Sequence, residues 1–179
     1  MDFTEKTISS KEIFDGKIVK LKVDTVTLPN GKTATRELID HPGGVGIVAV
    51  DENNRVYVVK QYRKPFDKVI TEIPAGKLEY GEEPLPAAIR ELEEETGCRA
   101  EKIIPMGSFY SSPGFCNEKI YLYLATGLTN VGQHLDEDEF LNAEKRDLDE
   151  LIAELSENKD ADGKTAIALL LAKQYLSRA

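Results

Sequence analysis

The densest group of potentially reactive side chains is the segment Arg90–Gly97, RELEEETG, which holds four glutamates. Glu91 and Glu95 lie one helical turn apart. Carboxylates are unfavourable at the carboxyl end of a helix, where the dipole is negative, and like charges at this spacing repel. Clustered carboxylate oxygens are ligands that Mg²⁺ or Mn²⁺ prefers, and such cations would offset the repulsion. The segment therefore predicts a divalent-cation site, with a solvated acidic helix surface as the alternative.

The glutamates fall at the end of a predicted central helix. Pro84 and Pro86 fit only the first turn of a helix, and Gly97 is suited to end it. Apolar residues at helical spacing predict its buried stripe: Leu85, Ala88, Ile89 and Leu92. Three of the glutamates, Glu91, Glu94 and Glu95, lie off that stripe and near one another, and Glu93 is expected only to face water.

Strands and two further helices are predicted around this helix. Asn30-Gly31 indicates a hairpin turn within residues 16–38. Further strands are predicted at 45–50 and 56–62, as a second hairpin, and at 69–76, 102–110 and 119–128. Residues 147–155 and 165–178 are predicted helices, the second starting at Asp162–Thr165. This order indicates a mixed α/β domain rather than repeated βαβ units.

Composition restricts the partners. The chain has 179 residues, 41% hydrophobic and 31% charged, which is typical of one globular domain with at most a small appendage. Its net charge of −9 argues against nucleic acid or an anionic membrane as partner, but not against a phosphorylated small molecule bridged by cations. Two cysteines without a CxxC motif, no signal peptide and no membrane-length apolar run predict a cytoplasmic protein with free thiols.

The wider segment GKLEYGEEPLPAAIRELEEETGC, residues 76–98, resembles the signature of the Nudix hydrolases, GX5EX7REUXEEXGU, in which U is a bulky apolar residue. Every fixed position matches, and Cys98 stands where Ile, Leu or Val is usual. The resemblance implies an α/β/α sandwich with a mixed sheet. It also implies an N-terminal antiparallel β extension, residues 1–40, before a Nudix domain, residues 41–179.

The same resemblance implies two or three Mg²⁺ or Mn²⁺ ions per site. The implied ligands are the carbonyl of Ala75 and the carboxylates of Glu91, Glu94, Glu95 and Glu139. Glu94 is also assigned to catalysis, and Glu137 is the implied general base; the alternative for residues 134–140 is a surface loop. Structural roles are implied for Gly76, Glu82, Arg90, Gly97 and Pro113, with Arg90 paired to Glu82.

Two features resemble the ADP-ribose pyrophosphatase branch of the family, in its short bacterial form. Pro113 lies sixteen residues after Gly97, and KQYRKP (60–65) precedes EIPAG (72–76). The implied substrate-binding residues are Arg36, Arg63, Glu72, Gly114 and Glu118. Surface ion pairs are the alternative for the arginines and a strand-edge carboxylate for Glu72, while Phe115 could pack or stack.

The expected function is Mg²⁺-dependent hydrolysis of ADP-ribose to AMP and ribose 5-phosphate. The resemblance further implies a homodimer that exchanges its N-terminal extension, so that Arg36 serves the partner's site. Three alternatives stay open: hydrolysis of a nucleotide sugar, dinucleotide polyphosphate or oxidised nucleotide; a non-catalytic ADP-ribose sensor; and RNA decapping, which the negative charge disfavours.

Overall fold

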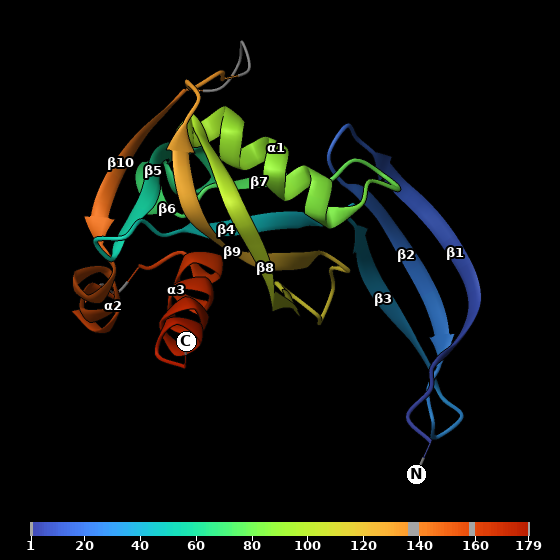
Figure 1. The fold of residues 1–179 in the computed structure, drawn as a ribbon. Helices are drawn as coiled ribbons and strands as arrows, with labels where there is room; N and C mark the ends of the chain where they lie inside the picture. Colours follow the sequence, from blue (N-terminus) through green and yellow to red (C-terminus); the bar gives the residue numbers. More distant parts are fainter. Residues whose placement is uncertain (1, 136–139, 158–159, 179) are drawn as a thin grey trace. The chain divides into compact units, whose positions relative to one another are not determined.

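The computed structural model describes residues 2–135, 140–157 and 160–178. The chain divides into two compact units. The first, called here the N-terminal unit, comprises Met1–Gly43 and Tyr110–Lys119; the second, called the main unit, comprises Gly44–Phe109 and Ile120–Ala179. Figure 1 shows the elements of both.

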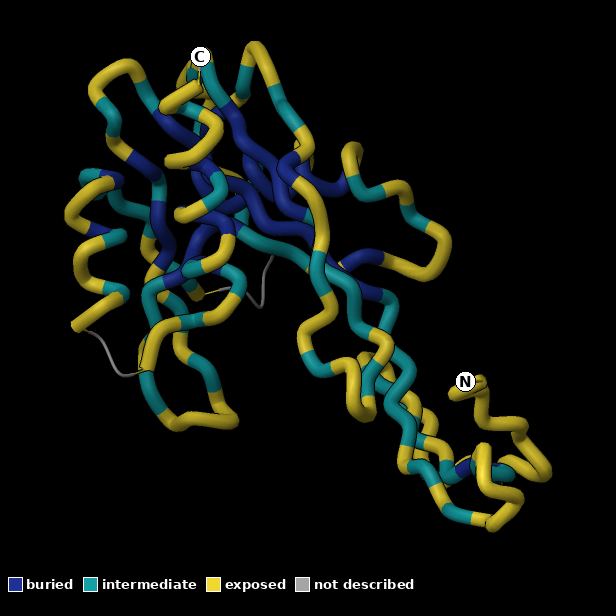
Figure 2. The backbone as a smooth tube through the Cα atoms, turned by 90° about the horizontal axis from the view of Figure 1, so that it is seen from below, coloured by how far each residue is buried: buried dark blue, intermediate teal, exposed yellow. Residues whose placement is uncertain are grey.

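The N-terminal unit contains a three-stranded antiparallel sheet in the order β1 (Lys6–Asp15), β2 (Lys20–Thr27), β3 (Thr33–Asp40). The predicted turn at Asn30-Gly31 is confirmed: it joins β2 to β3, and Gly31 adopts a φ of 79°, which glycine tolerates without strain. The strand β1 was not predicted. Every residue of β1 is exposed (Figure 2), so its sequence carries no alternation of buried and exposed positions.

The main unit contains two sheets. One is mixed and four-stranded, in the order β7 (Ala75–Lys77), β4 (Gly44–Ala49), β9 (Lys119–Asn130), β8 (Cys98–Tyr110); β4 runs parallel to β9 and antiparallel to β7. The other is antiparallel, in the order β10 (Leu141–Asp147), β5 (Arg55–Arg63), β6 (Lys68–Glu72), with the 3-10 helix η1 (Lys64–Phe66) between β5 and β6. The predicted mixed sheet is confirmed.

Two strand predictions are wrong. Residues 45–50 and 56–62 do not form a hairpin, because β4 and β5 lie in different sheets and meet only at the isolated bridge Val50–Val56. β4 is buried along its whole length and already has a neighbour on each edge. The single strand predicted at 69–76 is divided into β6 and β7 around Ile73-Pro74, since proline has no N–H to give to a ladder.

Helices cover both faces of the main unit, as Figure 1 shows for α1 (Pro84–Thr96) on one side and α2 (Leu148–Glu157) and α3 (Gly163–Leu176) on the other. Alternation along β4 explains the layers: Val45, Ile47 and Ala49 pack in one core cluster with α1, whereas Val48 lies in the cluster that contains α3. This confirms the α/β/α sandwich and all three predicted helices. Among the described residues, no helix is long and apolar enough to cross a membrane.

The buried side of α1 differs from the predicted stripe. Ala88 and Leu92 are buried as predicted, but Leu85 and Ile89 are 42% and 41% exposed. Their places are taken by Ala87, Glu91, Glu95 and Thr96. The helix is therefore turned so that two of its carboxylates, rather than two of its aliphatic side chains, face the sheet. The two thiols are both free, with Cys98 buried and Cys116 partly buried, as predicted.

Leu92→Ala should lower the free energy of unfolding by about 2–5 kcal/mol, since it opens a cavity between α1 and the sheet. Leu85→Ala, on the exposed side of the same helix, is the matched control and should cost less than about 1 kcal/mol. Urea unfolding of both variants measures the difference. Equal losses would contradict the orientation of α1 described above.

Candidate active site

The acidic end of α1 lies against the first two residues of β7. The backbone N–H of Ala75 donates to Glu95 Oε2 over 2.8 Å. At Gly76, a Cβ atom would lie 1.9 Å from the carboxyl carbon of Glu91, a separation that real Cβ atoms do not show. Glycine is therefore required at position 76 for the Glu91 carboxylate to occupy its place. These contacts hold two glutamates, one helical turn apart, against one backbone segment.

Both carboxylates are nearly withdrawn from water: Glu91 is 6% and Glu95 2% exposed. A buried carboxylate costs free energy unless it is compensated by charge or hydrogen bonds. The negative pole of the helix adds to that cost here. The solvated acidic surface considered from the sequence does not describe these two residues.

Arg90 is the cation beside this group. Its Nη1 lies 2.8 Å from Glu91 Oε1 and 2.8 Å from Glu94 Oε2, while its Nη2 lies 3.5 Å from Glu82 Oε1. The predicted pairing with Glu82 is thus present but is the longest of the three contacts. Burial lowers the pKa of Arg90, but the charges of Glu91 and Glu94 outweigh it and raise the pKa above its ordinary value.

The available donors fit a hard divalent cation. They are the carboxylate oxygens of Glu91, Glu94 and Glu95, with no thiolate or imidazole among them, and the backbone of Ala75 lies beside Glu95. Within the described ranges, no group of three or more acidic, histidine or cysteine side chains is placed so that it could hold a metal ion by itself. Glu137 and Glu139, the other two acidic candidates, lie outside the described residues.

Glu93 does more than face water, contrary to the expectation from the sequence. Arg99 donates from Nε to Glu93 Oε1 over 2.7 Å and from Nη2 to Oε2 over 3.1 Å. The hydrogen bonds from Arg99 lower the pKa of Glu93. This bidentate pair joins the last turn of α1 to the beginning of β8, on the part of the helix away from Gly76.

A second charged group lies in the main unit, around Glu72 at the end of β6. Arg63 donates from Nε to Glu72 Oε1 over 2.6 Å and from Nη2 to Oε2 over 2.8 Å. Lys164, in the first turn of α3, also contacts Oε2. Glu72 is only 2% exposed, so the strand-edge carboxylate considered from the sequence is in fact a buried ion-pair centre.

The two charged groups are within electrostatic range of each other. The hydrogen bonds to Glu72 raise the pKa of Arg63. Burial lowers this pKa, and the negative charges of Glu72, Asp162 and Glu95 add to the increase. The structure therefore brings Arg63 and Glu72 into the neighbourhood of the acidic end of α1. Lys164 was missed by sequence reasoning, because it lies 92 positions from Glu72 and no local pattern indicates that contact.

The remaining candidates belong to the N-terminal unit. Arg36 donates from Nε to Glu5 Oε2 over 2.9 Å, the surface ion pair that was the alternative for it. Glu118 Oε1 lies 3.5 Å from His41 Nδ1. Gly114 has open space where a Cβ would lie.

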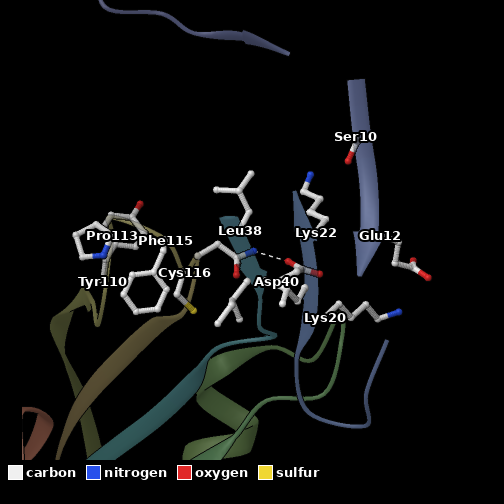
Figure 3. A pocket seen from close by; sticks show the side chains of 13 residues that line it. Ser10, Glu12, Lys20, Lys22, Leu38, Asp40, Tyr110, Pro113, Phe115 and Cys116 are labelled. Atoms are coloured by element: carbon white, nitrogen blue, oxygen red, sulfur yellow. Dashed lines mark hydrogen bonds between the residues drawn. The ribbon is translucent and has the colours of Figure 1, made fainter. Parts of the chain in front are cut away.

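A pocket of about 770 Å³ lies within this unit (Figure 3). Pro113, Phe115 and Tyr110 line one side of it, and Lys20 and Lys22 line the other. Phe115 is 52% exposed, so its ring is not packed away in a core.

Comparison with known proteins agrees with this geometry. A family model described as the NUDIX domain matches residues 40–170, and one described as the nucleoside diphosphate sugar hydrolase N-terminal domain matches residues 5–39. A protein of Bacillus methanolicus named methanol dehydrogenase activator is 49% identical over 97% of this chain and 93% of its own length. A protein of Bacillus subtilis (strain 168) named ADP-ribose pyrophosphatase is 45% identical over 96% of this chain and 92% of its own.

A solved structure titled as an ADP compounds hydrolase superposes with a TM-score of 0.86, over 99% of this chain and 97% of that one. Its sequence identity is 19%, so the likeness concerns the fold alone. The matched domain model and the two full-length relatives decide the class: this chain belongs to the Nudix family.

The free energy of unfolding should fall below about pH 4.5 through Glu72. Burial by itself raises the pKa of Glu72, but Arg63 and Lys164 outweigh it and lower the pKa below its ordinary value. The stabilisation is therefore complete above the ordinary pKa and is lost as the pH falls through the lowered one. In urea unfolding between pH 7 and pH 3, the difference between wild type and Glu72→Gln should shrink in the acid range; a constant difference would contradict this.

Proposed function

We propose that this protein hydrolyses ADP-ribose to AMP and ribose 5-phosphate. The observation that carries the proposal is the pair of buried carboxylates, Glu91 and Glu95, held against Ala75-Gly76 within a Nudix domain. The name of the Bacillus subtilis relative, ADP-ribose pyrophosphatase, supports the choice of substrate. In this reaction water adds to one phosphorus of the diphosphate, and the bond from that phosphorus to the bridging oxygen breaks.

Divalent cations, Mg²⁺ or Mn²⁺, are proposed to be held by Glu91, Glu94, Glu95, Glu139 and the Ala75 carbonyl. Bound there, they would neutralise the diphosphate, orient it and acidify the attacking water. The chain's own contribution is to fix the carboxylates in place. The N–H of Ala75 fixes Glu95, and Arg90 bridges Glu91 and Glu94. Glu94, which is proposed both as a cation ligand and as a catalytic group, is one of the two carboxylates that Arg90 joins.

The rest of the machinery is proposed from residue type. Glu137 accepts the proton of the attacking water, since a carboxylate base suits a water whose pKa is lowered. Arg63 offers forked donors to the diphosphate, and Glu72 orients the Arg63 guanidinium. Glu118 and Gly114 bind the terminal ribose side of the substrate, and Pro113 shapes their loop.

A homodimer is proposed, with residues 1–40 as an exchanged dimerisation domain that brings Arg36 to the partner's site, before the Nudix domain at 41–179. The exposed apolar side chains of β1, Ile8, Ile13 and Phe14, support a role for this strand in association. Light scattering measures the oligomeric state in solution. A fully active monomer would rule out a site shared between two subunits.

Purified protein with Mg²⁺ should convert ADP-ribose to AMP and ribose 5-phosphate, and Glu95→Gln should reduce turnover by about 100-fold or more with its fold retained. Product chromatography follows the reaction, and ¹⁸O water shows which phosphorus is attacked. The same assay is run with nucleotide sugars and dinucleotide polyphosphates. Nucleotide sugars are the main alternative substrate, because residues 5–39 match a nucleoside diphosphate sugar hydrolase N-terminal domain. Faster hydrolysis of one of these compounds than of ADP-ribose would make that compound the proposed substrate instead.

Gly76→Ala should lower turnover about 100-fold by displacing the Glu91 carboxylate. Because the displaced group is the end of a flexible side chain, the free energy of unfolding should fall by only about 1–3 kcal/mol. Gly163→Ala is the matched control: a Cβ there meets nothing within 4 Å, and turnover should be unchanged. Full activity of Gly76→Ala would show that the position of Glu91 is not needed.

A second candidate function follows from the name of the Bacillus methanolicus relative, methanol dehydrogenase activator. In that case the chain would stimulate an alcohol dehydrogenase. The discriminating assay adds wild type or Glu95→Gln to a purified methanol dehydrogenase and follows its rate. If the wild type raises the rate of the dehydrogenase and does not hydrolyse free ADP-ribose, the second candidate function is favoured.

A further inference from the structure

Lys164 is a nearly buried lysine at the start of α3 that the proposed reaction does not yet use. Its side chain is 12% exposed. Its ammonium contacts Glu72 Oε2 and lies 3.0 Å from Asp162 Oδ2. Lysine is seldom buried without a paired acid, and this one is placed between two.

The backbone holds this ammonium in a fixed place. Asp162 caps α3 by accepting from the N–H of Thr165 over 3.0 Å. The hydroxyl of Thr165 in turn accepts from the buried N–H of Ile73 over 2.9 Å. The first turn of α3 is therefore tied to the residue that follows Glu72, and Lys164 cannot easily leave that carboxylate.

Glu72 in turn orients Arg63. It accepts from Nε and Nη2 of the guanidinium, and within the part of the chain that the structure describes no other acceptor engages the remaining N–H groups. The Arg63 side chain is 40% exposed, so part of it is accessible to a ligand from solution. A guanidinium fixed along one edge presents the other edge to a second anion.

The charge balance shows what Lys164 adds. With Arg63 as its only cation, the buried Glu72 carboxylate would compete directly with any anion that approached Arg63. With Lys164 on Oε2, the charge of Glu72 stays compensated while Arg63 also contacts another anion. The arrangement allows one arginine to be shared between a buried carboxylate and a ligand.

We propose that Lys164 is a positioning residue for substrate binding: through Glu72, it fixes Arg63 in the orientation in which its free N–H groups meet the substrate's diphosphate. The inference rests on the proposed function, because it takes Arg63 to bind that diphosphate. It concerns a residue outside the Nudix signature, on the helix that covers the opposite face of the sheet from α1.

A double-mutant cycle tests the proposal. The dissociation constant for ADP-ribose is measured by calorimetry in EDTA, and KM and kcat are measured with Mg²⁺, for Lys164→Met, Arg63→Met and the double variant. Lys164→Met should raise the dissociation constant and KM about tenfold, the scale of one charge-assisted hydrogen bond, and change kcat less. In the Arg63→Met background it should have no further effect. The same fold-loss in both backgrounds would overturn the proposal, because Lys164 would then act independently of Arg63.

Three further proteins make the result decisive. Lys164→Arg should restore binding, because it supplies a cation to Glu72. Lys68→Met is the matched control: Lys68 pairs with Asp160 over 2.9 Å on an exposed surface, and binding should not change. If Lys164→Met does not fold, Lys164→Gln, which removes the charge that compensates Glu72 but keeps a polar side chain, takes its place in the cycle with the same expected outcomes.

The two proposals fail in different ways. A wild type that neither binds nor hydrolyses ADP-ribose overturns the proposed function and this inference with it. A wild type that hydrolyses ADP-ribose, with independent effects of Lys164 and Arg63, overturns only the inference.

Discussion

Two carboxylates at the C-terminal end of α1, those of Glu91 and Glu95, are withdrawn from water at the pole of the helix that repels them. Keeping them there restricts everything nearby. The helix must turn its acids toward the sheet, which leaves Leu85 and Ile89 exposed. Position 76 must have no side chain, and a cation, Arg90 in this structure, must stand beside the group.

The features that the sequence predicts well are those determined over one or two turns of chain. The proline pair and Gly97 define the limits of α1, and Asn30-Gly31 defines the β2–β3 turn. The pairing of β4 and β5 was wrongly inferred because adjacency in sequence says nothing about which edge of a buried strand is already occupied. The division at Ile73-Pro74 has a local cause that the sequence does contain, because Pro74 has no N–H to give to a ladder.

The candidate site shows the same limit. The spacing of Gly76, Glu91 and Glu95 indicates a shared site, and the geometry supplies the reason for the glycine. Lys164 has no such signal, since its contact with Glu72 depends on where α3 begins relative to β6. Glu93 was predicted only to face water, but it forms a bidentate pair with Arg99. That pair depends on where β8 begins after α1.

Side chains from helices on both faces of the sheet contact the short segment from Glu72 to Gly76. Lys164 and Thr165 contact it from α3, and Glu91 and Glu95 contact it from α1. The position of the segment against which the acidic end of α1 lies therefore depends on α3 as well as on α1. A substitution that removes the contact of Lys164 or Thr165 would release one side of this segment while leaving every residue of α1 unchanged. A change on the helix of the opposite face thus reaches the acidic end of α1 through the backbone of residues 72–76.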